Sequence, residues 1–366
     1  MPDISSQYEK KLEKEIAKAI RKIRAIYNQS IQDISFATYV RYGNLSGTTF
    51  QLDNYPALKR MLNNLTKDMH DKIVKAIEKA INDTWDLSNE KNDKIATDII
   101  QKVFPEMVNN GVVSALPGTS LIFNPNHDAL KAFTKRVEAG MNLSKRVWNL
   151  VRPYKFELEA GLTDGINRGL SATKMATNLK RYLKEPERLF RMVRDSKGKL
   201  QLSKEARAYH PGKGKGGSPG KPGIYRSSFK NALRLTATET NMAYRSADHE
   251  RWKNETFVKG IKVSVSNNHP FTEEICEFMQ GEYPKDFHFR GWHPRCRCHA
   301  IPILISDEEF SKQEDVLLGL SKKGPKIQEV KKIPASAKNW VKDNAKRIKG
   351  WKNKPYFLKD NPEYFK

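Results

Sequence analysis

The feature that most constrains the fold is a long apolar stripe that begins just after Pro56. Its members recur every three or four positions, and mostly polar or charged residues fill the gaps. This spacing places the apolar side chains on one face of an α-helix, and proline is favoured in a first helical turn. The stripe consists of Leu58, Leu62, Leu65, Met69, Ile73, Ile77, Ile81 and Trp85. The sequence therefore predicts a long amphipathic helix with one buried and one solvated face.

Shorter stripes of the same period run through the first half of the chain. They predict helices over 8–27, 90–104, 128–150, 154–168 and 172–184. Two further regions, 35–55 and 110–127, fit loops or short strands equally well. We therefore expect residues 1–195 to form a mainly helical N-terminal region. The whole chain is expected to be α+β, with a smaller α+β part in its C-terminal half.

The composition changes abruptly after this region. Residues 211–223 contain six glycines, three prolines and three lysines, and such a segment buries little apolar surface. We predict a flexible linker or loop over 196–226. Its lysines, Lys213, Lys215 and Lys221, are also candidates for contacts with nucleic-acid phosphates.

Residues 227–305 are predicted to form a compact α+β core. It opens with one long helix over about 227–254. Apolar residues then alternate over 258–265, which indicates a half-buried strand. Two further strands are predicted at 287–289 and 300–305, and a proline weakens the second of them.

The last segment, 306–366, is a basic tail that also carries aromatic residues. From Ser311 onward it has 15 Lys and Arg against 6 Asp and Glu. Aromatic side chains among lysines dock on proteins or stack on bases, and Lys346, Arg347 and Lys349 are candidate contacts to nucleic acid. The expectation that we favour is a helical tail that packs back on its own domain.

The charge of the whole chain indicates the kind of partner. The chain has 66 Lys and Arg against 42 Asp and Glu, a formal net charge of +24. A surplus of this size indicates a polyanionic partner or surroundings. No stretch approaches the roughly 20 consecutive apolar residues of a transmembrane helix, and the N-terminus lacks the pattern of a secretory signal. We therefore expect synthesis in a reducing cytoplasm and no membrane span.

All three cysteines of the chain lie within one short stretch. If that stretch is extended, Cys296 and Cys298 point to one face and the arginines beside them to the other. Cys276 and an imidazole, from His293 or His269, would complete three thiolates and one imidazole, which are preferred ligands of zinc. A structural zinc is one prediction, and buried free thiols or a single disulfide are the alternative.

The same stretch also permits a catalytic interpretation. Two imidazoles, a carboxylate and a guanidinium are the residue types of a metal-independent ribonuclease. The candidates are His269, Glu273, Arg290 and His293. The simpler interpretation is that the His-Pro pairs are rigid turn corners. We favour that interpretation and keep a nuclease or toxin as the alternative. The sequence shows neither a glycine-rich phosphate loop nor a convincing Ser/His/Asp set.

The predicted helix before this stretch carries a polar stripe along one face. Its members are Arg234, Thr238, Asn241 and Arg245, with Glu239 beside them. A solvated face is the usual explanation for such a stripe. A Thr-Glu pair flanked by arginine can instead tie the Cys/His stretch down through buried hydrogen bonds and a salt bridge, and we favour this scaffold role over catalysis.

Together these motifs resemble the phage Mu F-like head morphogenesis family, the minor head proteins of tailed bacteriophages and prophages. The resemblance covers about residues 150–305, and the string His-Pro-Arg-Cys-Arg-Cys at 293–298 is its most specific part. Many members carry Cys-x-x-Cys in the loop where this chain has Cys276 and Met279. The residues that carry the resemblance are Arg234, Thr238, Glu239, Gly281, Trp292, His293, Pro294, Cys296 and Cys298.

The resemblance implies a protein present in few copies in the virion, inside the capsid near the portal and made in the host cytoplasm. The implied partners are the portal protein, the major capsid or scaffold protein, and double-stranded phage DNA held by phosphate contacts without base recognition. The implied function is head assembly or genome delivery. The net charge of +24 is compatible with a place beside packaged DNA.

Overall fold

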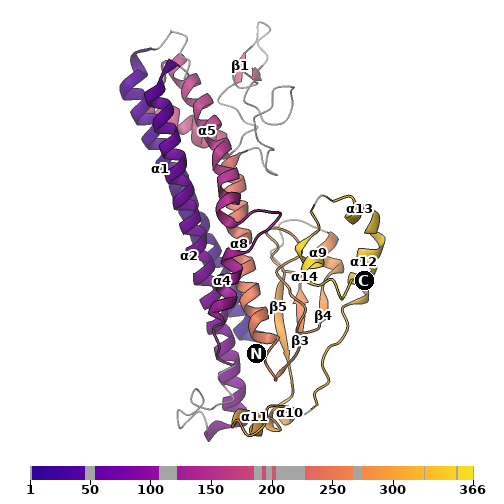
Figure 1. Ribbon diagram of the computed structural model, residues 1–366. Coiled ribbons are helices and arrows are strands. Elements are labelled where there is room, and N and C mark those ends of the chain that lie inside the picture. Colours follow the sequence, from indigo (N-terminus) through magenta and orange to yellow (C-terminus); the bar gives the residue numbers. More distant parts are fainter. Residues whose placement is uncertain are drawn as a thin grey trace. The chain divides into compact units, whose positions relative to one another are not determined.

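The computed structural model shows a mainly helical protein with a small three-stranded sheet in its C-terminal half, which confirms the predicted α+β class (Figure 1). The described residues are 2–45, 54–106, 122–184, 192–194, 200–202, 227–266, 274–324, 326–351 and 353–365. Within these ranges, no helix combines the length and the apolar character needed to cross a membrane.

Long helices dominate the first part of the chain. They are α1 (Pro2–Tyr42), followed by the 3-10 turn η1 (Gly43–Leu45), α2 (Pro56–Val103), α4 (His127–Lys135), α5 (Leu143–Asn167), α6 (Ala172–Lys184) and α8 (Ser228–Trp252). The strands are β1 (Met192–Arg194) and β2 (Leu200–Leu202), which pair with each other, then β3 (Val258–Ser264), β4 (Gly281–Tyr283) and β5 (His299–Leu304). The remaining short helices are α9 (Glu274–Phe278), α10 (Asp307–Ser311), α11 (Glu314–Leu317), α12 (Ala335–Asp343), α13 (Ala345–Lys349) and α14 (Tyr356–Asp360).

Two helices are longer than predicted. α1 continues over residues 36–42, where the sequence left loop and strand open. The predicted helices 56–85 and 90–104 are a single helix, α2. Neither glycine nor proline follows Pro56 within this helix, so no residue in it forces the chain to leave the helical conformation.

The predicted helix 128–150 is wrong, because the chain breaks between α4 and α5. α4 ends at Lys135, because Arg136 leaves the helical conformation with φ of −59° and ψ of 153°. Ala139 and Gly140 then have φ values of 52° and 78°, in the left-handed region, which no right-handed helix can include. The Asn142 side chain then accepts a hydrogen bond from the N–H of Lys145 and caps α5. Pro153 lies inside α5 instead of separating two helices, at the cost of one backbone hydrogen bond.

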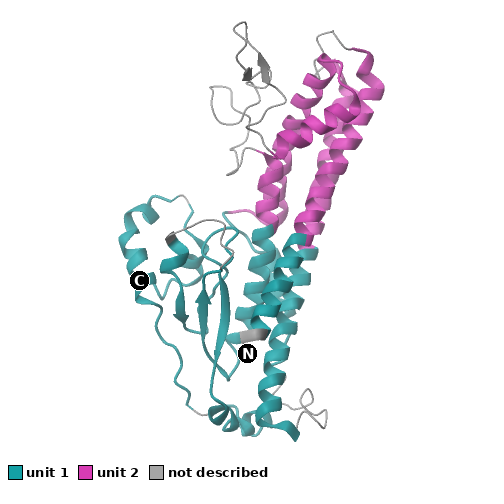
Figure 2. Cartoon of the chain, turned by 180° about the vertical axis from the view of Figure 1, so that it is seen from behind, with its two compact units in different colours: residues 1–17, 79–139, 237–366 teal, residues 18–78, 140–236 magenta. Residues whose placement is uncertain are grey.

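The chain divides into two compact units (Figure 2). Unit 1 comprises residues 1–17, 79–139 and 237–366, and unit 2 comprises residues 18–78 and 140–236. Helices α1, α2 and α8 therefore contribute residues to both units. This division does not follow the boundaries predicted from the sequence. Parts of the N-terminal helices belong to unit 1, together with the sheet formed by β3, β4 and β5. Of the predicted linker 196–226, only β2 is among the described residues.

The sheet of unit 1 has the strand order β4-β3-β5, and both pairings are antiparallel. β5 is an edge strand, where Pro302 is tolerated although it cannot donate a ladder hydrogen bond. The predicted strand 287–289 is wrong, and the strand lies earlier, at β4. Phe287 and Phe289 are apolar because both side chains are buried in the core, and neither belongs to a ladder.

In unit 1, one hydrophobic core combines the three-stranded sheet with helices that precede it in the sequence and helices that follow it. α2 contributes Ile99, α8 contributes Trp252, and the tail contributes Phe357. Trp292 lies among aromatic rings, with its centroid 4.9 Å from that of Phe289 and 5.6 Å from that of Phe357. The tail therefore packs on its own domain, which confirms the expectation that we favoured.

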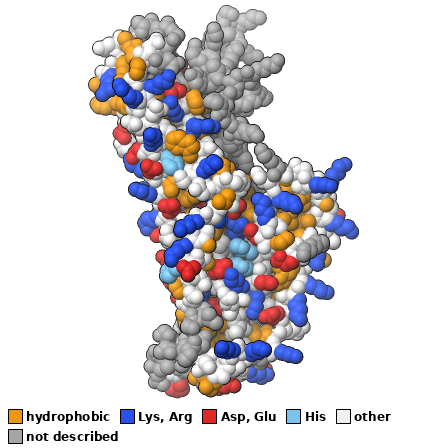
Figure 3. All heavy atoms as spheres, viewed as in Figure 1, with side chains coloured by type: hydrophobic (Ala, Val, Ile, Leu, Met, Phe, Trp, Pro, Cys, Tyr) orange, Lys and Arg blue, Asp and Glu red, His pale blue; other side chains and the backbone are white. Residues whose placement is uncertain are grey.

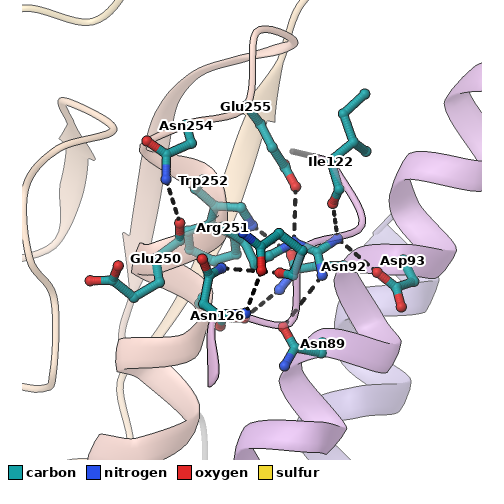
Figure 4. A network of polar contacts seen from close by, with 12 residues as sticks. Asn89, Asn92, Asp93, Ile122, Asn126, Glu250, Arg251, Trp252, Asn254 and Glu255 are labelled. Carbon is teal, nitrogen blue, oxygen red and sulfur yellow. Dashed lines mark hydrogen bonds and ion pairs between the residues drawn. The ribbon is translucent and has the colours of Figure 1, made fainter. Parts of the chain in front are cut away.

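Charged side chains are also buried inside unit 1. Lys91 of α2 and Asp248 of α8 form an ion pair with 2.7 Å between Nζ and Oδ2, and each residue is 1% exposed. Beside them, Arg251 of α8 bonds to Asp93 at 2.7 Å and to the carbonyl oxygen of Ile122 (Figure 4). A buried charge that loses its partner costs about 3–5 kcal/mol, so these pairs specify which residues of α2 and α8 face each other.

Unit 2 is held together mainly by aromatic and apolar packing. Tyr27 of α1 contacts Tyr154 of α5 and Phe229 of α8, with ring centroids 4.9 Å and 5.3 Å away. Where α6 packs on α5, a Cβ at Gly165 would lie 2.5 Å from the side chain of Met175. The missing side chain of this glycine therefore lets the two helices approach closely.

Candidate metal centre

Three thiols and one imidazole meet in unit 1, directly before strand β5. Cys276 comes from α9, whereas His293, Cys296 and Cys298 come from the segment that leads into β5. All three thiols are free and buried. The ligand atoms of Cys276, His293 and Cys296 lie within 4.8 Å of one another. The thiol of Cys298 interacts with both other thiols, but it is not within 4.8 Å of all three of these ligand atoms.

The cluster has the donor atoms and the size of a tetrahedral zinc site. Zinc bonds are about 2.3 Å to sulfur and about 2.0 Å to nitrogen, so ligand atoms in a tetrahedral site lie about 3.5–3.8 Å apart. The Sγ of Cys276 lies 3.2 Å from Nε2 of His293. Cys276, His293 and Cys296 are therefore close enough to share an ion, and Cys298 would become the fourth ligand after a movement of its side chain.

The imidazole of His293 is oriented for metal binding. Its Nδ1 lies 3.0 Å from the carbonyl oxygen of Pro294. Because a carbonyl oxygen only accepts, this contact favours a proton on Nδ1 and directs Nε2 toward the thiols, where Nε2 can bind a metal once it has lost its own proton. A metal-bound histidine commonly uses its second nitrogen in this way.

The electrostatics of the cluster favour a thiolate. Burial opposes ionisation of Cys296, but hydrogen bonds with Cys276, Cys298 and His293 hold its pKa well below the ordinary thiol value. Burial also opposes protonation of His293, yet its hydrogen bonds with Cys276 and Cys296 raise its pKa to about 11. The site therefore stabilises negative charge on one sulfur, that of Cys296, while hydrogen bonds within the cluster raise the pKa of Cys276 and Cys298. Thiolate is the form of cysteine that binds zinc.

A tight turn brings these residues together. Gly291 and Arg295 have φ values of 99° and 64°, and a Cβ at Gly291 would lie 2.9 Å from the Cβ of Cys296. The N–H of Cys296 donates to the carbonyl oxygen of His293 at 3.0 Å and closes the turn. After the turn, Cys296 and Cys298 are buried and the arginines beside them are exposed, which confirms the predicted alternation.

Helix α8 holds this turn through the predicted polar stripe. Thr238 Oγ1 accepts a hydrogen bond from the N–H of Arg295 at 3.2 Å. Asn241 Nδ2 donates to the carbonyl oxygen of Cys296 at 3.3 Å. The hydrogen bonds of the scaffold are therefore present as predicted. The salt bridge of Glu239 is with Arg136, at 2.7 Å, a residue that the sequence did not single out.

Other residues of the motif support the same region. Trp292 fills the core beside the cluster, and the carbonyl of Pro294 orients the imidazole. Gly281 opens β4 with φ of 140°, and a Cβ there would lie 2.6 Å from the side chain of Pro334. Arg234 belongs to unit 2.

The candidate catalytic residues have other partners where the structure describes them. The guanidinium of Arg290 bonds to Glu138 at 2.9 Å and to Asp360 at 2.7 Å, which neutralises the charge that phosphate chemistry would use. His293 faces the thiols. His269 and Glu273 lie outside the described residues.

Two half-buried, stacked histidines were missed by the sequence analysis. His249 of α8 stacks on His288, with ring centroids 4.3 Å apart and ring planes 14° apart. Burial lowers the pKa of both rings, that of His249 to about 4, so both are neutral at neutral pH. No periodic pattern links these two positions. The pair Lys91 and Asp248 was also missed, and a run of polar residues at 88–93 inside α2 was its only sign.

The candidate nucleic-acid contacts of the tail are exposed. Lys346, Arg347 and Lys349 lie on α13, while Ile348 between them is buried. Figure 3 shows Lys and Arg side chains over the part of unit 1 that carries α12 and α13, with hydrophobic side chains between them. The candidates at 213, 215 and 221 lie outside the described residues.

Comparisons with known proteins assign no family. No protein-family model, curated protein or solved structure matches the chain. What the protein does is therefore inferred from its own residues and contacts.

Proposed function

We propose that the chain is a minor head protein of a tailed phage or prophage, inside the capsid near the portal, where it contacts DNA and assists head assembly or genome delivery. One observation supports this most strongly. Residues of the Mu F-like motif that are distant in the sequence contact one another, as Thr238 does with Arg295. A chance similarity has no reason to select residues that form one connected site.

The proposed contact with DNA is electrostatic. The net charge of +24 favours binding to phosphates without base recognition. Exposed basic residues of α13 supply part of this surface. The portal protein and the major capsid or scaffold protein are the proposed protein partners.

We further propose that Cys276, His293, Cys296 and Cys298 hold a structural zinc. A bound zinc would fix α9 and the turn before β5 against each other, because its four ligands come from both. With all four positions taken by protein side chains, the ion has no open position for a substrate. Its role is therefore in stability and not in catalysis.

Metal analysis of the purified chain tests the zinc. About one zinc per chain is expected, and Cys276→Ser or His293→Gln should lose most of it. His299→Gln is the matched control, because His299 is next to Cys298 but outside the ligand set. A metal-free preparation with unchanged folding and thermal stability would overturn this part of the proposal.

Localisation tests the function. Quantitative mass spectrometry of purified procapsids and mature particles should find a few copies per particle, and deletion of the gene should reduce the yield of DNA-filled heads. Absence from both kinds of particle would overturn the proposal. Incubation with labelled RNA and DNA gives a second test, since cleavage that a His293→Ala variant loses would establish the nuclease instead.

Salt dependence tests the DNA contact. Affinity for duplex DNA should fall steeply with salt, and the triple variant K346A/R347A/K349A should make the slope of log affinity against log salt shallower by about 2–3. The control K322A/K323A/K326A removes the same charge from another exposed part of the tail. An equal effect of both variants would mean that α13 makes no particular contact.

A further inference from the structure

A cleft of about 640 Å³ lies in unit 1 between the C-terminal tail and the turn of the metal cluster. Its size is within the range of about 300–1,000 Å³ that is usual for ligand sites. From the tail it is lined by Trp340, Trp351 and Tyr356, and from the turn by Trp292 and His293. Both segments belong to the same compact unit.

The aromatic side chains of this cleft offer surfaces for stacking. Trp340, Trp351 and Tyr356 are all partly exposed, whereas the neighbouring Phe357 is fully buried and packs on Trp292. Phe357 therefore holds the tail on the core, and the other rings stay partly exposed. The guanidinium of Arg347 lies 5.8 Å from the centroid of the Trp351 ring, so a base would share this ring with a cation. The faces of such rings bind planar aromatic ligands, such as nucleic-acid bases.

The charge of the cleft favours an anionic ligand. Arg347, Lys354 and Lys359 line it and are exposed, and the only acidic group among the described lining residues is Glu138. The carboxylate of Glu138 is neutralised, because it bonds to Arg290 at 2.9 Å and to Arg136 at 3.3 Å. The lining is therefore net positive.

We infer that this cleft binds unpaired nucleotides of a single-stranded nucleic acid. Bases would stack on Trp351 and Trp340, and the phosphates between them would contact Lys354 and Lys359. Duplex DNA does not fit this chemistry, since the faces of its bases are covered by neighbouring base pairs. The inference goes beyond the proposed function, which requires only phosphate contacts with duplex DNA, and it stands on the cleft alone.

Fluorescence anisotropy with a labelled oligothymidylate of 12 nucleotides, beside a 12-base-pair duplex, tests the inference. Trp351→Ala should weaken binding of the single strand roughly ten-fold and leave duplex binding unchanged. Trp351→Phe keeps an aromatic face and should retain most of the affinity. The control Phe278→Ala removes an exposed ring of the same unit from outside the cleft, and should change neither affinity.

Charge variants give an independent test of the same site. K354Q/K359Q should reduce the slope of log affinity against log salt for the single strand by about 1.4. K338Q/K342Q is the matched control, because these lysines are exposed on α12 and do not line the cleft. Circular dichroism and thermal unfolding of each variant separate lost binding from lost folding.

Three results would overturn the inference. The first is that Trp351→Ala, while folded, binds the single strand as tightly as the unaltered chain. The second is that it loses duplex and single-strand binding equally. The third is that a polyglutamate peptide displaces the oligothymidylate at equal charge concentration, which would identify the cleft as a site for acidic peptides. None of these results bears on whether the chain is found in phage heads.

Discussion

The two compact units bury different kinds of polar groups. Inside unit 1 the buried groups include full charges, such as Lys91, Asp248 and Arg251. Inside unit 2 most of them are hydroxyls, and several bond within their own helix, as Thr66 does with the carbonyl oxygen of Leu62 at 2.6 Å. Glu157 and Glu159 are exceptions, and the carboxylate of Glu157 accepts hydrogen bonds from the N–H and the hydroxyl of one serine.

This difference shows how each unit fixes the alignment of its helices. An apolar seam offers similar contacts at more than one register, whereas a buried ion pair is satisfied at one register only. Unit 1 must hold α8 in one position, because Thr238 and Asn241 of this helix hold the turn of the metal cluster. We therefore expect unit 1 to depend on its charges and unit 2 on its packing.

The largest effect is expected when Asp248 is changed. Asp248→Ala leaves Lys91 without its buried partner and also removes the acceptor of Ser88 and Asn92. The free energy of unfolding should fall by about 3–5 kcal/mol, measured by urea denaturation. Asp86→Ala is the control, because Asp86 is exposed on α2, the helix that carries Lys91. A loss below 1 kcal/mol for Asp248→Ala would show that the ion pair does not hold unit 1 together.

A comparable loss in unit 2 should come from an apolar residue. Ile73 is fully buried in α2, so Ile73→Ala should cost about 2–5 kcal/mol and Ile73→Val about 1 kcal/mol. In the Ile73→Ala variant, backbone amide hydrogen exchange should become faster than in the unaltered chain for peptides of unit 2. Mass spectrometry measures this exchange peptide by peptide. Equal acceleration in peptides of unit 1 would contradict the division into two separately stabilised units.

A smaller effect is expected from pH, and in unit 1. Burial lowers the pKa of His249 from 6.5 to about 4, with Lys253 and Arg290 acting in the same direction and Asp286 against it. Below pH 6.5 the unfolded chain binds a proton that the folded chain does not. Stability from this group is therefore complete above pH 6.5 and falls as the pH approaches 4, by about 2 kcal/mol between pH 7 and pH 5.

Substitution isolates this contribution. His249→Phe keeps a ring that can stack on His288 but cannot be protonated, so its urea denaturation should lose less stability between pH 7 and pH 5 than that of the unaltered chain. His127→Gln changes an exposed histidine of the same unit and should keep the full pH dependence. Identical pH profiles for His249→Phe and the unaltered chain would assign the effect to other groups.

The smallest effect is expected for an exposed ion pair of unit 2. Lys72 and Asp68 lie 2.7 Å apart on the surface of α2, and each side chain is more than half exposed. Asp68→Asn should change the free energy of unfolding by no more than about 0.5 kcal/mol, and less at high salt. A loss above 1 kcal/mol would mean that charge contributes to unit 2 as it does to unit 1.

The helices were the most predictable part of the fold. The apolar residues of α2 recur at the helical period over many turns, and this period depends only on local geometry. The break at Ala139 was not predictable, because alanine is a good helix former and takes a left-handed conformation here only within its tertiary surroundings. Likewise, the alternating positions of Phe287 and Phe289 are typical of a strand. Both side chains are buried, but neither residue belongs to a strand.

The sequence predicted the residue types of the candidate site, but not the contacts that hold these residues in place. The alternation of Cys296 and Cys298 follows from extended geometry, and zinc chemistry indicated Cys276 and one histidine, His293 or His269, as the remaining ligands. The sequence could not indicate that Arg136 pairs with Glu239, since these residues are 103 positions apart. Contacts of this kind depend on how helices pack, which no local pattern encodes.

The place of Pro302 has a consequence for the behaviour of many copies of the chain. The N–H of Ile305 points toward β3, so by the alternation of a strand the nitrogen of Pro302 is on the outer side of β5. A strand from a second molecule would find no donor there. Edge-to-edge polymerisation of the sheet is thereby discouraged, even where chains are crowded together.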